Sequence, residues 1–275
     1  MKNKKVSGFD MGPTIQWYEA NLEMFTARLP MPVQYFAGPP RFYLEDPHGL
    51  HVLTLADIQG VLAVFPLKAR NRMLINKITF DRSVWFTQAS TKEKPVPTLD
   101  IAKAISATAI APSKVDVENL PPRFWSRFRM NPVLFQIQDL VAPEIRRIIH
   151  LEGLAHELAH SIVNVEMWNS DNCRLVSDQV GNKSIFEFIS EAEAAINSAP
   201  PISHYAGAYF DPVTGQLPPN SLVGIAESLA EAIAAYLLGF AFRTDGDGLS
   251  PFVGRDSLYE IVKWYLNAER VLTTE

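Results

Sequence analysis

The chain has 275 residues, of which 47% are hydrophobic and 20% charged, and its formal net charge is −5. This composition is typical of a globular protein with one large domain or two small ones, and it excludes a chain that is disordered throughout. The negative charge, and the lack of any Lys/Arg run longer than a pair, argue against nucleic acid or an anionic membrane as a partner.

The single cysteine, Cys173, excludes an intramolecular disulfide and a zinc site built from cysteines. The basic residues 1–5 are followed by a stretch with Asp10, Pro13 and Glu19 instead of an apolar run, so no conventional signal peptide is predicted. The most apolar long stretch, 225–242, contains acidic residues and favours a buried helix over a membrane span. We therefore expect a cytoplasmic protein, or one exported without a conventional signal peptide.

The first part of the chain has the pattern of short strands. Between residues 30 and 111, β-branched and aromatic runs alternate with turn residues, which predicts strands at 41–44, 51–55, 77–80 and 83–87, with a helix at 55–64. Prolines then interrupt the chain repeatedly up to residue 122. We expect residues 1–125 to form a mixed strand and helix portion whose strands form the upper wall of a cleft.

The second part of the chain, residues 126–275, has a helical pattern. Apolar residues follow Pro143 mostly at steps of three and four, which predicts a buried helix of about six turns. Further helices are predicted at 184–197, 224–242 and 256–272. Residues 210–219, rich in proline and glycine, predict a hairpin or loop.

The helix predicted from Pro143 contains the motif HExxH, as His156, Glu157 and His160. Residues four apart on a helix project from the same face, so both imidazoles can bind one ion. Neutral imidazole suits Zn²⁺, which in catalytic sites takes three protein ligands and keeps one position for water. Glu157 follows the first histidine directly and can act as general base toward that water.

The third metal ligand has three candidate sources in the sequence. Glu166 follows the motif, but it would point away from the histidines if the helix continued. Glu187 and Glu191 are a second source, although their surroundings also suit an ordinary amphipathic helix. The third source is Glu227, which together with Glu231 would place two carboxylates four residues apart on a small, apolar helix.

Three segments together, 156–160, 202–206 and 227–232, resemble the gluzincin zinc peptidases of the anthrax lethal factor and Mlc titration factor A type. The resemblance implies that Glu227 is the third zinc ligand and that Glu231 orients a ligand histidine. It also implies that the Tyr205 hydroxyl stabilises the tetrahedral intermediate. In those relatives the tyrosine and the ligand glutamate lie close in sequence, whereas residues 210–219 separate them here, so Tyr209 and His204 stay open as alternatives to Tyr205.

The sequence thus predicts an α+β, zincin-like fold in which the N-terminal portion packs on the helical portion and a metal lies between them. The expected function is that of a zinc-dependent metallopeptidase, an endopeptidase acting on a protein or peptide. An extended substrate is expected along an edge strand, at 77–79 or 83–87. The alternative is an inactive zinc-binding relative that recognises a protein partner, and whether residues 210–219 gate the site stays open.

Two other features are given no role in catalysis. Residues 245–248 lack the remaining oxygen ligands of an EF-hand and predict a turn. Glu152, one turn before His156, could support a metal ligand, but it is expected instead to be a surface or capping carboxylate.

Overall fold

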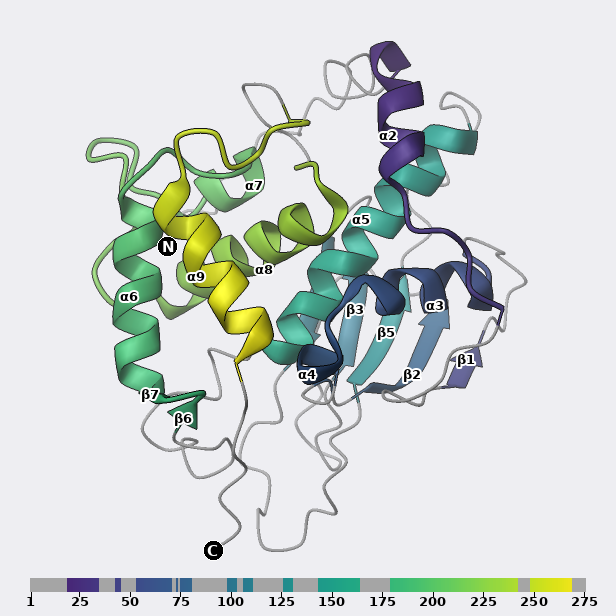
Figure 1. Ribbon diagram of the computed structural model, residues 1–275, viewed down its shortest axis with the longest axis horizontal. Helices are drawn as coiled ribbons and strands as arrows, with labels where there is room; N and C mark the ends of the chain where they lie inside the picture. Colours follow the sequence, from purple (N-terminus) through teal and green to yellow (C-terminus); the bar gives the residue numbers. More distant parts are fainter. Residues whose placement is uncertain are drawn as a thin grey trace, which may run out of the picture.

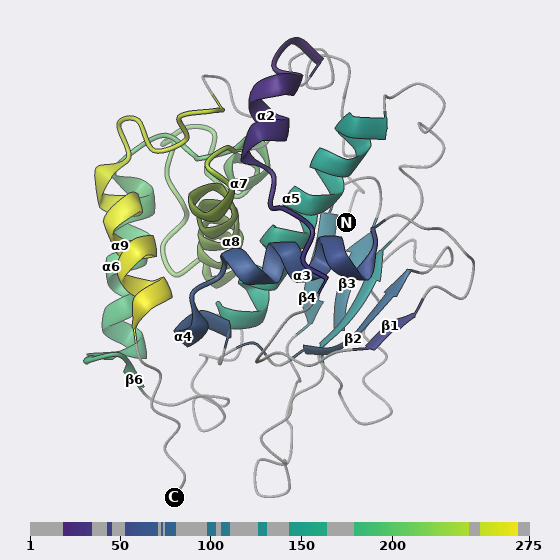
Figure 2. The same cartoon turned by 45° about the vertical axis from the view of Figure 1, so that its right-hand side comes forward.

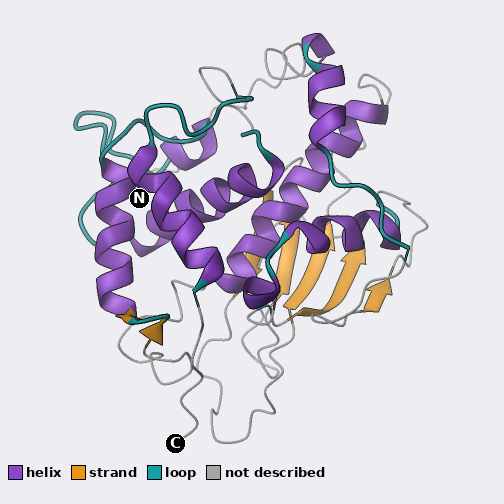
Figure 3. Cartoon of the chain, in the orientation of Figure 1, coloured by secondary structure: helices purple, strands orange, loops and turns teal. Residues whose placement is uncertain are grey.

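The computed structural model describes residues 19–34, 43–45, 53–70, 73, 75–80, 98–102, 106–110, 126–130, 143–163, 179–241 and 248–268. Over these residues the protein is mostly helical, and the longer strands gather on one side of the molecule (Figure 1, Figure 3). The described residues after 143 form helices, loops and one short hairpin, β6 (Gln179–Val180) with β7 (Lys183–Ser184). The described residues after 143 are therefore mainly helical, as the sequence predicted.

Five strands form one mixed sheet: β1 (Tyr43–Glu45), β2 (Ile75–Phe80), β3 (Thr98–Ala102), β4 (Ser106–Ile110) and β5 (Ser126–Met130). Their order is β1-β2-β5-β3-β4, and all pairs are parallel except β3 with β4. β5 begins at Ser126 and lies between β2 and β3, so the sheet extends past the predicted boundary between residues 125 and 126. The division into two portions stays a prediction.

The strand predicted at 77–80 forms most of β2, but it is not an edge strand. β2 lies between β1 and β5, and over the described part of the chain the edges of the sheet are β1 and β4. The expectation of a substrate along residues 77–79 is therefore wrong, because the backbone of β2 is already paired on both sides. The other strand considered, 83–87, lies outside the described residues.

Helix α3 (Leu55–Val64) has the predicted bounds and is preceded by a capping box. The Thr54 hydroxyl accepts a hydrogen bond from the Asp57 N–H at 3.1 Å, and the Asp57 carboxylate accepts one from the Thr54 N–H at 3.0 Å. The strand predicted at 51–55 is therefore wrong over its described residues, 53–55, because these residues lead into and begin α3. α3 lies in front of the sheet in both views, with the short α4 (Leu67–Arg70) after it (Figure 1, Figure 2).

Helix α5 (Pro143–Ile162) begins at the predicted proline and runs for 20 residues through the centre of the molecule. It contacts β3, β4, α3 and α2 (Leu22–Arg28) on one side and α8 (Leu222–Leu238) on the other. Its apolar side chains are buried along the whole helix, as these examples show: Ile145, Ile148, Leu151, Leu154, Leu158 and Ile162. α5 therefore connects the sheet to the helical portion.

Helix α8 is enclosed by α5, α6 (Ile185–Asn197), α7 (His204–Gly207) and α9 (Asp256–Asn267). It ends four residues before the predicted limit of 242, because Gly239 adopts the left-handed conformation with φ of 75° and caps the helix. The Tyr265 hydroxyl on α9 donates a hydrogen bond to the Ile162 carbonyl, which connects α9 to the end of α5. No helix among the described residues has the length and apolarity that a membrane span needs.

Candidate metal centre

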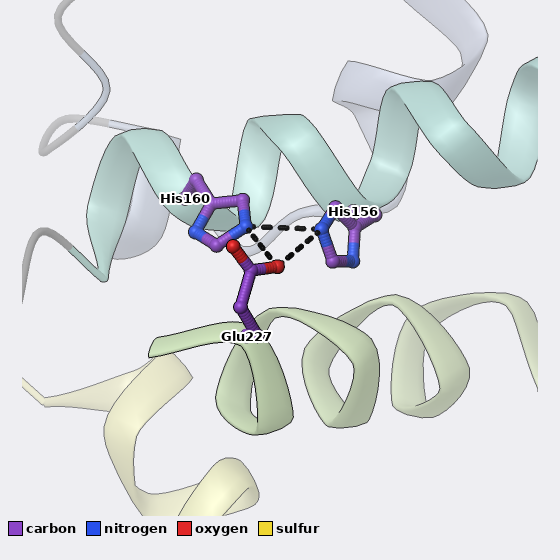
Figure 4. Close-up of side chains that lie close together, drawn as sticks. All are labelled: His156, His160 and Glu227. Atoms are coloured by element: carbon purple, nitrogen blue, oxygen red, sulfur yellow. Dashed lines mark hydrogen bonds and ion pairs between the residues drawn. The ribbon is translucent and has the colours of Figure 1, made fainter. Parts of the chain in front are cut away.

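Three side chains from two helices meet at the contact between α5 and α8. His156 and His160 lie on one face of α5 and point toward Glu227 on α8 (Figure 4). The Nε2 atoms of the two imidazoles are 2.9 Å apart, and the Glu227 Oε2 lies 3.1 Å from His160 Nε2 and 3.3 Å from His156 Nε2. Two nitrogens and one carboxylate oxygen therefore converge on a single point.

This group could hold a metal ion. Its ligand atoms all lie within 4.8 Å of one another, and no second group of this kind occurs among the residues that the structure describes. Bonds of about 2.0–2.1 Å at a tetrahedral ion place neighbouring ligand atoms about 3.3 Å apart. The three observed separations, 2.9 to 3.3 Å, are close to that value. The donor set thus fits a small ion with nitrogen and oxygen ligands.

Glu231, one turn after Glu227 on α8, lies beside the other nitrogen of His156. The distance from its Oε1 to His156 Nδ1 is 2.9 Å. A carboxylate at this nitrogen fixes the tautomer in which Nδ1 carries the proton and Nε2 is a free ligand atom. Of the two histidines that Glu231 was expected to serve, the structure places it at His156.

Glu157 is fully buried next to the histidines. Its Oε1 lies 3.7 Å from His156 Nε2, the ring nitrogen that faces Glu227. Glu157 therefore lies close to the three converging side chains but does not belong to the group itself.

Burial and charge act against each other on these groups. Burial alone would raise the pKa of Glu227, but the two imidazoles hold that pKa well below its usual range. Burial likewise would lower the pKa of His156, but Glu227, Glu231 and Glu157 raise it well above its ordinary value. The surrounding carboxylates thus favour positive charge at His156, whether a proton or a metal ion supplies it.

Two tyrosines border the same site. The Tyr205 ring, in the one-turn helix α7, meets the His156 ring edge to face with centroids 5.7 Å apart. The hydroxyl of Tyr209 lies 3.4 Å from that of Tyr205. Burial and the charge of Glu227 raise the pKa of the Tyr205 phenol, which keeps it neutral and able to donate a hydrogen bond.

No protein-family model, curated protein or solved structure matches the chain.

The structure excludes one predicted source of the third ligand. Glu187 accepts hydrogen bonds from the Ser184 N–H at the start of α6, and Glu191 forms an ion pair with Lys183. Both glutamates are exposed, so neither is a third ligand to the histidines. Glu166 lies outside the described residues, as do Cys173 and residues 245–247 of the predicted turn.

Two further expectations about single residues need comment. Glu152 is only 6% exposed, so the expectation of a surface carboxylate is wrong: it lies on a stretch of α5 where nearly every side chain is enclosed. His204 begins α7, and the described contacts do not include its side chain. Sequence reasoning treated Tyr209 as an alternative to Tyr205, but the structure brings both to the site. Their spacing of four residues was the available signal.

Proposed function

We propose that this protein is a zinc-dependent metallopeptidase with a zincin-like α+β fold. The observation that carries the proposal is the convergence of His156 and His160 from α5 with Glu227 from α8, beside the fully buried Glu157. Two imidazoles and one carboxylate are a ligand set of catalytic zinc, which keeps a further position open. A structural zinc site, in contrast, is closed by four protein ligands.

Each residue then has a defined task in hydrolysis of a peptide bond. Zinc supplies Lewis acidity, which activates water and polarises a carbonyl group. Glu157 accepts the proton of the attacking water and returns it to the leaving amine. Tyr205 donates a hydrogen bond to the oxyanion as the carbonyl becomes tetrahedral.

The edge strand β4 offers a place for an extended substrate. Among the strands that the structure describes, β4 pairs with β3 on one side only, and it contacts α5, the helix that carries both histidines. A peptide that adds to the free side of an edge strand gains backbone hydrogen bonds and is held in extended form. We propose β4 (Ser106–Ile110) in place of residues 77–79 as the strand that holds the substrate.

Substitution of the proposed general base tests this function. Wild type and Glu157→Gln are loaded with zinc and incubated with a diverse peptide library. Glu187→Gln, at an exposed glutamate on α6, is the matched control. Glu157→Gln should keep its zinc and lose cleavage by a factor of about 10² or more, since it cannot accept a proton. The control should cleave like wild type.

Two outcomes would contradict the proposal. Cleavage that persists in Glu157→Gln would remove Glu157 as the base. A wild type that binds zinc stoichiometrically but cleaves nothing in the library would instead favour an inactive zinc-binding protein that recognises a protein partner.

A further inference from the structure

Tyr205 and Tyr209 form a pair at the border of the metal centre. Their rings are arranged edge to face with centroids 5.9 Å apart, and their hydroxyl oxygens are 3.4 Å apart. Tyr205 is the member that contacts His156. Tyr209 lies after the end of α7, where the chain enters residues 210–219.

The chemistry of the phenol group determines which tyrosine of this pair donates to the other. A tyrosine hydroxyl has one proton to donate and can accept hydrogen bonds at its oxygen. When the Tyr205 hydroxyl donates a hydrogen bond to an oxyanion, its oxygen can accept a hydrogen bond from the Tyr209 hydroxyl. The hydrogen bond from Tyr209 polarises the Tyr205 hydroxyl and so strengthens the hydrogen bond that Tyr205 donates to the oxyanion.

Residues 210–219 determine where Tyr209 lies. The loop closes on itself, because the Asp211 N–H donates to the Gln216 carbonyl and the Gly215 N–H donates to the Asp211 carbonyl, both at 2.8 Å. Leu217 is buried, and its N–H donates to the Asn197 side chain at the end of α6, at 2.7 Å. The loop is therefore attached to the helical portion and is not free to swing across the site.

The same loop packs on α8 one turn before Glu227. A Cβ atom at Gly224 would lie 2.6 Å from Leu217 Cδ2 and 3.3 Å from Tyr209 Cβ, so this glycine lets both residues approach the helix. Leu217 and Tyr209 thus contact α8 at the same residue. The contact of Tyr209 with Gly224 therefore fixes its position relative to α8, the helix that carries Glu227.

We propose that Tyr209 is a positioning residue that acts through Tyr205, and that residues 210–219 anchor it against α8 instead of gating the site. The inference rests on the proposed peptidase function for its kinetic consequence. Its structural part, the hydrogen-bonded tyrosine pair and its anchor, does not depend on activity.

A double-mutant cycle tests the order of action. Tyr205→Phe should lower kcat by about 10²-fold or more, the usual effect of removing a donor to the oxyanion. Tyr209→Phe should lower kcat by roughly 5- to 10-fold, the effect of one neutral hydrogen bond, with KM and zinc content unchanged within about twofold. The double variant should equal Tyr205→Phe, because Tyr209 acts only through that hydroxyl. Additive losses would overturn the order and indicate a separate packing role for Tyr209.

A spectroscopic measurement on the zinc-loaded protein tests the pair without activity. With tyrosine labelled at ¹³Cζ, and the Tyr205 resonance assigned by its loss in Tyr205→Phe, the Tyr209→Phe variant should shift that resonance. An unchanged Tyr205 resonance would overturn the hydrogen-bonded pair. If the protein cleaves nothing but the Tyr205 resonance still shifts in Tyr209→Phe, the peptidase function is contradicted while the tyrosine pair is supported.

The anchor is tested with two variants of the same loop. Leu217→Ala removes a buried side chain, whereas Val213→Ala changes a residue that is 90% exposed. Amide hydrogen exchange at residues 204–210 should become at least about tenfold faster in Leu217→Ala and stay unchanged in Val213→Ala. Leu217→Met, which keeps the side-chain volume, should retain wild-type exchange and guard against general loss of folding. Equal exchange in Leu217→Ala and wild type would overturn the anchoring role.

Discussion

His156 is the residue on which the arrangement of the site depends most, because it has a carboxylate at each ring nitrogen. Glu227 lies 3.3 Å from Nε2 and Glu231 lies 2.9 Å from Nδ1. The two glutamates come from successive turns of α8, so one helix brings a carboxylate to each nitrogen of the His156 ring. This explains why a buried helix contains two carboxylates among small apolar residues.

The role of Glu231 leads to a prediction about metal affinity. Glu231→Gln should weaken zinc binding by about 10- to 100-fold without abolishing it, because the ligand atoms remain while the His156 ring loses its charged partner. Competition with a chromogenic chelator measures the affinity, and Glu191→Gln, at an exposed glutamate on α6, is the matched control. Affinity equal to that of the control would show that Glu231 does not orient the ring.

At the scale of single residues, the sequence was a good guide where the chemistry is local. HExxH on a helix predicts that the two histidines share one face with a glutamate beside them, because spacing alone decides which side chains share a face. Glu187 was misjudged because Ser184 and Glu187 form the Ser-x-x-Glu pattern of a capping box, which the structure shows. That pattern gives Glu187 a local partner, whereas Glu227 has its partners on another helix.

At the scale of elements, α5 is held in place through its contact with α3. The Arg147 guanidinium, near the start of α5, donates to Asp57 Oδ1 at 2.8 Å, while Asp57 also caps α3 through Thr54. Burial alone would raise the pKa of Asp57, but Arg147 and Thr54 hold it below its ordinary value of 3.8. One carboxylate therefore connects a helix cap to the helix that carries the histidines.

This connection predicts a stability effect that depends on pH. Because the pKa of Asp57 is lower in the folded state than its ordinary value of 3.8, its charge stabilises the fold above pH 3.8 and this contribution is lost as the pH falls through the folded-state pKa. Asp57→Asn should lower the free energy of unfolding by about 1–2 kcal/mol at pH 7. The difference from wild type should shrink below about pH 4.

Urea denaturation at several pH values measures both effects. Asp256→Asn, at an exposed aspartate in the first turn of α9, is the matched control and should change stability by less than about 0.5 kcal/mol. A loss of stability in Asp57→Asn that stays constant from pH 7 to pH 3 would contradict a role for its charge.

The sequence predicted where helices lie along the chain better than it predicted which elements lie side by side. The periodicity after Pro143 and the run at 55–64 gave α5 and α3 with correct starting residues, because helix signals are local. The position of β2 inside the sheet could not be predicted, because it depends on pairing with β5, about fifty residues later. The position of β4 at the edge next to α5 could not be predicted either, because it also depends on how the strands pair.

At the scale of the whole molecule, the site exists because α5 lies between the sheet and α8. The sequence separates His160 and Glu227 by 67 residues, and no local pattern measures the distance between them. The resemblance to gluzincins linked the two segments, and the structure places their side chains within 3.1 Å. A metal ion bound by both helices would join the helical portion to the part that packs on the sheet.

The most direct test of this account is the zinc content of Glu227→Ala after dialysis against a moderate chelator at neutral pH. Wild type and Glu187→Ala should each retain about one zinc per chain, whereas Glu227→Ala should retain almost none, because two imidazoles alone hold the ion too weakly. A circular dichroism spectrum like that of wild type would show that the loss is not due to unfolding. Full retention of zinc by folded Glu227→Ala would contradict the assignment of Glu227 as the third ligand, and with it the metal centre between α5 and α8.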